Sequence, residues 1–325
     1  MDLLIVEPLE SEVTRWLASR HAVRCAPELA HDPRAFRQAL PGVRALVIPP
    51  SVTLDANVLH RAPRLVAVGR VSSGAENLDA EACARAGVEV VRSITATAPA
   101  EAEFTIGALL SLLRRVPVVG PDGMPVGREL GACTVGLVGM GPAARTMAQM
   151  LVPFGAHVTG YDPSLHASDP LWARWQVRPL GLRELLQACD AVCVLLPLFT
   201  RYRGLLGERL LPWCKPDQVI VSVAHSAVFD EGALARALAS GRVAAAWLDS
   251  VEPGVLDPGR PLHGVDALQV TPRVASTTRE SRTRSAWAVA RRIDQLLSPQ
   301  PADEGAFKPT LPGAGSGLAA DPASR

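Results

Sequence analysis

The sequence predicts an α/β protein with two doubly wound parallel sheets, and three observations predict this fold class. Short apolar runs rich in β-branched residues alternate with helical patterns along most of the chain, which is typical of consecutive βαβ units. The chain has 325 residues, which is long enough for two domains. One apolar run leads through a glycine turn directly into a helix and a second strand, within residues 134–163.

The segment 134–163 has the element order of a dinucleotide-binding unit. Gly139 and Gly141 follow its first strand, and residues without a Cβ let a pyrophosphate approach the amides of the next helix. Ala144 takes the third small position, which allows close packing of helix on strand. Asp162 ends the second strand and suits the ribose hydroxyls of NAD, whereas it would repel the 2′-phosphate of NADP. We therefore predict NAD as cofactor, bound by Gly139, Gly141, Pro142, Ala143, Ala144 and Asp162.

The first hundred residues predict a small open α/β domain. Strands are expected at residues 3–6, 45–48, 65–69 and 88–91, and helices at residues 11–19 and 80–86. The helical spacing of Phe104, Leu109 and Leu112 then predicts a long helix over residues 99–115. This helix is expected to cross into the second domain.

The rest of the chain predicts the remainder of a larger parallel sheet. Strands are expected at residues 191–196, 219–223, 244–248 and 268–270, and helices at residues 182–188, 230–240 and 277–297. We expect one domain from residues 1–98 with 276–297, and a second from residues 99–275. Residues 298–325 are rich in Pro, Gly, Ala and Ser, which predicts a disordered tail.

The composition excludes several classes of partner. With 33 basic and 32 acidic residues, the net charge is +1, so no charge excess suits nucleic acid or a membrane surface. No apolar run reaches the length of a membrane span, and no signal peptide is recognisable. The six cysteines form no CxxC pair, and no His, Cys or carboxylate cluster has metal-ligand spacing. We expect small-molecule partners, reduced thiols, a cytoplasmic location and no metal.

From about Leu46 to Leu297 the chain resembles the D-isomer-specific 2-hydroxyacid dehydrogenases, the family of D-phosphoglycerate and D-glycerate dehydrogenases. The matching segments occur in the family's order, at residues 74–79, 102–105, 139–162, 196–198, 228–234, 249–253 and 271–272. The resemblance implies an NAD-binding Rossmann domain inserted into a smaller, flavodoxin-like substrate domain. It also implies a homodimer, formed through the crossing helix and the sheet edge of the NAD domain.

The resemblance further implies the residues of an active site. The substrate carboxylate is expected at the backbone amides of Ser72, Ser73, Gly74 and Ala75. Additional cofactor contacts are expected from Pro197, Ala224 and Asp249. Glu252 matches the family's glutamate, which raises the pKa of a catalytic histidine.

Two catalytic positions depart from the family. His225 stands where the family has a substrate-binding arginine, and Arg273 follows Thr-Pro where the family has its histidine. A guanidinium stays charged and cannot donate a proton near neutral pH, whereas histidine titrates at about pH 6.5. We therefore predict a mirrored site, in which His225 exchanges the proton and Arg273, paired with Glu252, holds the substrate. The reaction would be hydride transfer between NAD(H) and a 2-oxo or 2-hydroxy acid.

Two other hypotheses remain open at this stage. In one, the protein binds NAD(H) without dehydrogenase activity and serves as a sensor or assembly partner. In the other, it reduces a different group, such as an imine or a specialised oxo acid in a biosynthetic pathway. The sequence leaves open the substrate, the direction of the reaction and whether catalysis survives the exchange of the two residues.

Overall fold

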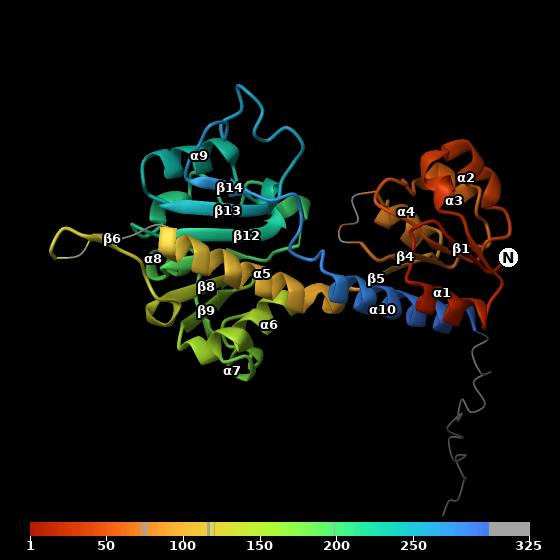
Figure 1. Cartoon of the computed structure of the whole chain (residues 1–325), viewed down its shortest axis with the longest axis horizontal. Coiled ribbons are helices and arrows are strands. Elements are labelled where there is room, and N and C mark those ends of the chain that lie inside the picture. The colour runs from red at the N-terminus through yellow and green to blue at the C-terminus, as the bar shows by residue number, and fades with distance from the viewer. Residues whose placement is uncertain (73, 75–76, 116–117, 120, 198, 299–325) are drawn as a thin grey trace, which may run out of the picture.

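The computed structural model describes residues 1–298, except residues 73, 75–76, 116–117, 120 and 198. The chain forms two parallel sheets of five and seven strands, which lie in two lobes joined by a narrow waist (Figure 1). Two helices, α5 (Ile94–Arg115) and α10 (Arg279–Leu297), lie along this waist. The predicted α/β class with two parallel sheets is confirmed.

The smaller lobe holds the five-stranded sheet, in the order β2-β1-β3-β4-β5. Its strands are β1 (Leu3–Ile5), β2 (Val23–Cys25), β3 (Ala45–Val47), β4 (Ala67–Arg70) and β5 (Glu89–Arg92). Helices α2 (Pro33–Ala39), α3 (Ala56–His60) and α4 (Ala80–Arg85) pack on one face, and α1 (Ser11–Ala18) and α10 pack on the other. Because both faces are covered, strands β1, β3 and β4 are buried throughout, and β1 and β3 consist of apolar residues alone.

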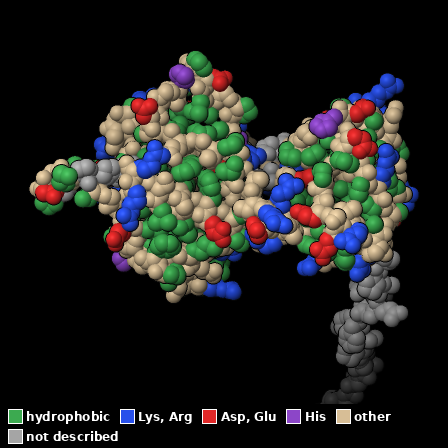
Figure 2. Space-filling view, viewed as in Figure 1, with side chains coloured by type: hydrophobic (Ala, Val, Ile, Leu, Met, Phe, Trp, Pro, Cys, Tyr) green, Lys and Arg blue, Asp and Glu red, His purple; other side chains and the backbone are tan. Residues whose placement is uncertain are grey.

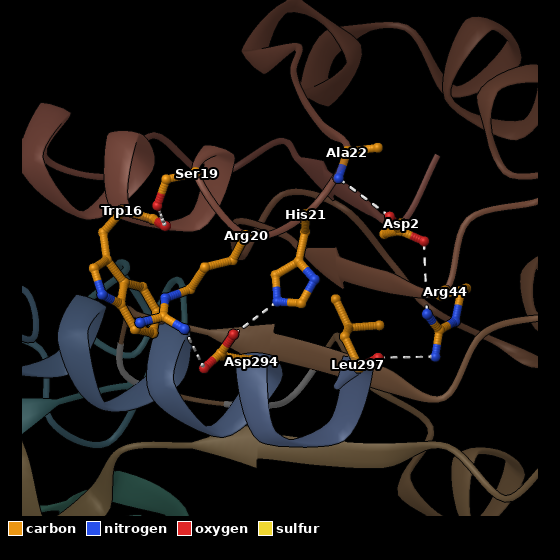
Figure 3. Close-up of polar contacts among 9 residues, drawn as sticks. All are labelled: Asp2, Trp16, Ser19, Arg20, His21, Ala22, Arg44, Asp294 and Leu297. Carbon is orange, nitrogen blue, oxygen red and sulfur yellow. Dashed lines mark hydrogen bonds and ion pairs between the residues drawn. The ribbon is translucent and has the colours of Figure 1, made fainter. Parts of the chain in front are cut away.

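Helix α10 returns the end of the described chain to the smaller lobe. Gly69 in β4 lies beneath it, and a Cβ there would come within 2.5 Å of a methyl group of α10, so glycine permits the close approach. Polar contacts fasten the last turns of α10 (Figure 3). His21 Nε2 lies 2.8 Å from Asp294 Oδ1, and Arg44 donates to the carbonyl of Leu297 at 3.2 Å. The helix that follows the second sheet in sequence therefore packs on the first.

The larger lobe holds the seven-stranded sheet, in the order β10-β9-β8-β11-β12-β13-β14. Its strands are β8 (Thr134–Val138), β9 (His157–Tyr161), β10 (Arg178–Pro179), β11 (Ala191–Val194), β12 (Val219–His225), β13 (Ala245–Ser250) and β14 (Leu268–Val270). The chain builds outward from β8 in one direction and then from β11 in the other. The strand order therefore reverses between β8 and β11, which is the topological switch point of this sheet.

Helices cover both faces of the larger sheet. Helices α5 and α6 (Pro142–Leu151) pack on one face with the short α7 (Leu171–Arg174), and α8 (Leu182–Ala188) and α9 (Glu231–Ala239) pack on the other. The ring of Phe104 meets Trp247 edge to face, with ring centroids 5.8 Å apart, which fixes α5 against β13. A two-stranded hairpin, β6 (Val118–Val119) and β7 (Pro125–Val126), projects from this lobe (Figure 1).

The differences from the expected elements have local causes. Helix α5 begins at Ile94 and not at residue 99, so Pro99 lies inside it and one helical N–H is missing. Strand β12 extends two residues beyond the expected end, which places His225 in the strand. The unexpected β2, α2, α3 and hairpin are short and carry too few residues for a periodic pattern. The tail, expected from residue 298, lies after Ser298 outside the described residues.

Candidate functional site

Ligands of open α/β sheets bind beyond the carboxyl ends of the strands at the switch point. In the larger sheet this edge faces the waist between the lobes (Figure 1). Most of the predicted cofactor and catalytic residues lie along it, although they come from the ends of six different strands. Gly139 follows β8, Asp162 follows β9, His225 ends β12, and Asp249 lies one residue before the end of β13.

The glycine turn after β8 has the geometry that a dinucleotide needs. Gly139 has φ +95°, and a Cβ there would lie 3.0 Å from the carbonyl oxygen of Leu195, so the position requires glycine. A Cβ on Gly141 would meet nothing within 4 Å, which shows open space in front of the helix. Pro142 begins α6, Ala143 and Ala144 are buried in its first turn, and no side chain caps its N-terminus. The first amides of α6 therefore face this space without a side-chain partner, as a pyrophosphate site requires.

Asp162 lies beside the same turn. Its Oδ2 accepts the Met140 N–H at 2.7 Å, and its Oδ1 accepts the Ser164 N–H at 2.8 Å. These bonds hold a partly exposed carboxylate next to the glycines, on the side of the switch point where β9 lies. A carboxylate in this place can accept hydroxyls of a ribose and disfavours a 2′-phosphate, so the turn fits NAD.

A second group of residues lies at the carboxyl ends of β12, β13 and β14. His225 pairs with Ser250 in the ladder of β12 and β13. The Ser250 hydroxyl accepts from Arg273, at 3.1 Å from Nε and 2.9 Å from Nη2. The Ser226 hydroxyl accepts the backbone N–H of Glu252 at 3.0 Å. The strand ends that carry His225, Glu252 and Arg273 are therefore neighbours, joined by the β12–β13 ladder and by the Ser226 and Ser250 hydroxyls.

Arg273 has an unusual backbone conformation, with φ +56°. Left-handed φ is uncommon for a residue with a side chain and costs about 1 kcal/mol or more. The turn is held by Asp249, which is 2% exposed. The Asp249 carboxylate accepts the Thr271 hydroxyl at 2.6 Å and the backbone N–H groups of Val274 and Ala275 at 2.8 and 2.9 Å. A buried carboxylate thus maintains the strained turn that presents Arg273.

Glu252 and Arg273 line one pocket. The loop after β13 and the turn after β14 enclose about 410 Å³, with Val251, Leu256 and Pro272 among the lining residues. The Glu252 carboxylate pairs with Arg203 across 3.3 Å. The Arg203 partner was not expected from the sequence, and the pairing of Arg273 with Glu252 stays a prediction.

The hydrogen bond of the His225 ring bears on its proposed role. Its Nδ1 accepts the backbone N–H of Ala227 at 3.2 Å. This bond favours the neutral tautomer whose proton is on Nε2. The charged imidazolium needs a proton on Nδ1 as well, and that proton would oppose the Ala227 N–H. In this structure Nδ1 of His225 is therefore an acceptor.

Two further cofactor residues predicted from the sequence lie on the same edge. Pro197 is exposed three residues after β11, and Ala224 is buried in β12 next to His225. Their positions agree with a cofactor that crosses the strand ends from β9 toward β13. No contact in the structure tests the individual roles of Pro197, Ala224 and Asp249 in binding NAD.

The predicted carboxylate-binding turn follows β4 in the smaller lobe. Ser73 and Ala75 lie outside the described residues, and Gly74 has φ +89°. The backbone N–H of Ser72 donates to Glu7 at 3.0 Å, and its hydroxyl also bonds to this carboxylate. The Ser72 amide is therefore already occupied by a protein carboxylate.

Sequence reasoning missed Glu7 and Arg70. Glu7 is 3% exposed and also accepts the Val71 N–H at 3.2 Å, so it fixes the start of the turn. Arg70 is 2% exposed and bonds the Asn77 side chain at the other end of the turn. A signal existed for both, since each is a charged residue directly at the end of an apolar strand.

The described residues contain neither a metal-binding cluster nor a membrane-spanning helix. In this part of the chain no group of three or more His, Cys, Asp or Glu side chains is placed to hold a metal ion. No helix of the described ranges combines the length and apolarity needed to cross a bilayer. On the face drawn in Figure 2, acidic and basic side chains are interspersed, with no large field of one sign.

Comparisons with known proteins agree with this geometry. Residues 120–275 match the family model described as D-isomer specific 2-hydroxyacid dehydrogenase, NAD binding domain. The chain is 31% identical over 304 residues to the (S)-sulfolactate dehydrogenase of Chromohalobacter salexigens, covering 91% of this chain and 98% of that protein. It is 32% identical over 290 residues to the D-3-phosphoglycerate dehydrogenase of Mycobacterium tuberculosis, covering 86% of this chain but only 53% of that longer protein. The crystal structure of a Thermus thermophilus protein superposes with a TM-score of 0.74 at 26% identity, covering 91% of this chain and 97% of that chain.

Proposed function

Because this chain belongs to the D-isomer-specific 2-hydroxyacid dehydrogenase family, we propose that it transfers a hydride between NAD(H) and a 2-oxo or 2-hydroxy acid at the waist between its lobes. It is an NAD-dependent oxidoreductase by family, and the open glycine turn with Asp162 fits that cofactor. We assign residues 99–275 to cofactor binding, and residues 1–98 with 276–297 to substrate binding.

We propose that Arg273 anchors the substrate. The supporting observation is its left-handed backbone, φ +56°, held by the buried Asp249. Strain of this kind persists only where the surrounding structure enforces it, and it concentrates at functional sites. The guanidinium carries a permanent charge and two-pronged donor geometry that suits a carboxylate or an oxo oxygen. Glu252, in the same pocket, would orient this guanidinium once substrate is bound.

We propose that His225 moves the proton. Bound NADH supplies the hydride in the direction of reduction. The oxygen that then gains charge needs a proton donor within reach, and His225 is the histidine at this strand edge. In this proposal the ring leaves its Nδ1 bond to Ala227, so that Nδ1 can hold its own proton while Nε2 donates.

Steady-state assays with NADH and a panel of 2-oxo acids, with imino acids as a second panel, test this function. We expect His225→Ala to lower kcat by about 10²- to 10⁴-fold. We expect Arg273→Ala to raise KM strongly, because it removes the substrate's cation. His31→Ala and Arg34→Ala, on the exposed surface of the smaller lobe, are matched controls and should leave both constants unchanged.

The proposal fails if no 2-oxo acid is turned over, or if His225→Ala is as active as the wild type. Turnover confined to the imino acids would instead support the reductase of a different group. NADH binding without turnover on either panel would support the sensor or assembly partner.

We also propose a homodimer. The supporting observation is the apolar surface of the projecting hairpin, where Val119 is 73%, Met124 61% and Val126 45% exposed. Leu110, on the crossing helix α5, is exposed as well. Light scattering after size exclusion should give twice the chain mass of 34.4 kDa, and a single-chain mass over the micromolar range would refute the dimer.

A further inference from the structure

Glu101 is a carboxyl group at the strand edge that the proposed mechanism does not use. It lies in the second turn of α5, the helix that packs on β12 and β13. Thr97 and Thr105, one turn before and one turn after it, are buried, so Glu101 lies on the inner side of the helix. One turn along this side, Phe104 contacts Trp247 of β13. Glu101 itself is only partly exposed, and it is near enough to Asp249, at the end of the same strand, for the Asp249 charge to raise its pKa.

Glu101 differs from Asp249 and Glu252, the other two acids near this edge, because its negative charge has no cation beside it in the described residues and is not held by several hydrogen-bond donors. The Asp249 carboxylate accepts three donors from the turn after β14. The Glu252 carboxylate pairs with Arg203. For Glu101, by contrast, no ion pair with a Lys, Arg or His side chain of the described ranges lies within 4.0 Å, and the nearby Thr97 hydroxyl donates to the Ile94 carbonyl at 3.1 Å. Burial raises the pKa of Glu101, and the Asp249 charge adds to this effect.

The strand order fixes which end of the cofactor reaches Glu101. Asp162, which suits the adenine-side ribose, follows β9 on one side of the switch point. A dinucleotide whose pyrophosphate lies at the glycine turn after β8 must then extend across the switch point toward β11, β12 and β13. The nicotinamide would therefore lie near the ends of β12 and β13, where Asp249 lies and where α5, which carries Glu101, packs on the sheet.

The two redox forms of the cofactor differ in charge at this end. The oxidised nicotinamide ring carries one positive charge, and the reduced ring is neutral. A partly buried carboxylate without a cation interacts strongly with a positive ring, because solvent screens it poorly. The same carboxylate has no comparable electrostatic attraction to the neutral ring of NADH. We propose that Glu101 is a specificity-determining residue that makes the site favour NAD⁺ over NADH.

Equilibrium binding tests this inference without relying on turnover. The dissociation constants of NAD⁺ and NADH are measured by calorimetry for the wild type, Glu101→Gln and Glu103→Gln. Glu103 lies on the same helix but is exposed, so it is the matched control. We expect Glu101→Gln to weaken NAD⁺ binding by about five- to tenfold and to change NADH binding by less than about twofold. Glu103→Gln should change neither.

A third variant separates charge from packing. Glu101→Asp keeps the charge on a shorter side chain and should retain part of the preference for NAD⁺. The inference is overturned if Glu101→Gln leaves the ratio of the two constants unchanged, including the case in which it weakens both forms equally. If the wild type binds neither dinucleotide, this inference falls together with the cofactor assignment. If it binds both but turns over no substrate, only the proposed reaction falls.

Discussion

The turn after β8 and the turn after β14 lie on one edge of one sheet, yet they are built in opposite ways. In the first, glycine and alanine leave backbone amides and open space for a ligand. In the second, Arg273 is forced into a left-handed backbone by the buried Asp249. The turn after β8 is thus made of small residues and uncapped backbone donors, whereas the turn after β14 carries a strained backbone and a buried charge.

This difference explains why one turn follows the family pattern and the other departs from it. A pyrophosphate is recognised by backbone N–H groups, which every sequence has, so the pattern there requires only small residues. A substrate is recognised by side chains, so a change of substrate or of proton route changes residue types. Of the two residues that the resemblance implies are exchanged, Arg273 lies in the turn after β14 and His225 ends β12.

The largest effect is expected from breaking the cofactor turn. Gly139→Ala places a Cβ 3.0 Å from the Leu195 carbonyl oxygen at φ +95°, so the turn must shift. We expect NADH affinity to fall roughly a hundredfold, or about 2.7 kcal/mol, in a fluorescence titration. Gly107→Ala is the matched control, because a Cβ there meets nothing within 4 Å. It should leave affinity unchanged and stabilise α5 by about 0.5–1 kcal/mol. Equal affinities for the two variants would contradict the geometry of the glycine turn.

The next effect is expected at the turn after β14, where the Asp249 carboxylate holds the backbone. Asp249→Asn replaces one acceptor oxygen by an amide nitrogen that faces a hydroxyl or backbone donor. We expect the free energy of unfolding to fall by about 2–3 kcal/mol in urea, because a buried donor loses its partner. Asp266→Asn, at an exposed position, should stay within about 0.5 kcal/mol of the wild type. A substitution at Asp249 as mild as that at Asp266 would show that the turn does not depend on this carboxylate.

The smallest effect is expected on the free energy of unfolding, which the ionised Glu101 carboxylate lowers. Its folded-state pKa is raised, so the folded protein loses stability as the pH rises and the buried carboxyl ionises. Glu101→Gln carries no such charge. We therefore expect the variant to match the wild type below about pH 4, where both side chains are neutral. At pH 8 without cofactor we expect it to be more stable, by an amount on the order of 1 kcal/mol. A variant that is less stable at pH 8 would mean that the charge is compensated in the free protein.

Strong apolar runs made much of the fold predictable. The expected strands at residues 45–48 and 268–270 and the helix at 182–188 match β3, β14 and α8 within one residue. Shorter elements were not predicted, because β2 and the hairpin have only two or three residues per strand. The start of α5 also escaped, because Pro99 reads as a first-turn residue when only the local sequence is considered.

The candidate site was predictable only where its parts are close in sequence. The glycine turn and Asp162 lie within one βαβ unit, so their spacing alone predicts their meeting. The resemblance supplied His225, Glu252 and Arg273, but not the serines between them, nor Arg203 beside Glu252. Glu101 and Asp249 are almost 150 residues apart, and neither belongs to a motif with the other.

By itself the sequence determined the α/β class with two parallel sheets and NAD as the cofactor, because hydrophobic period and glycine spacing are local properties. Only the tertiary structure decided which charges are compensated. The ends of β12, β13 and β14 and the helix α5 meet near Asp249. There the Asp249 carboxylate accepts hydrogen bonds from the next turn, whereas burial raises the pKa of Glu101. That outcome depends on distances between residues far apart in the chain, and no local pattern of residues encodes such distances.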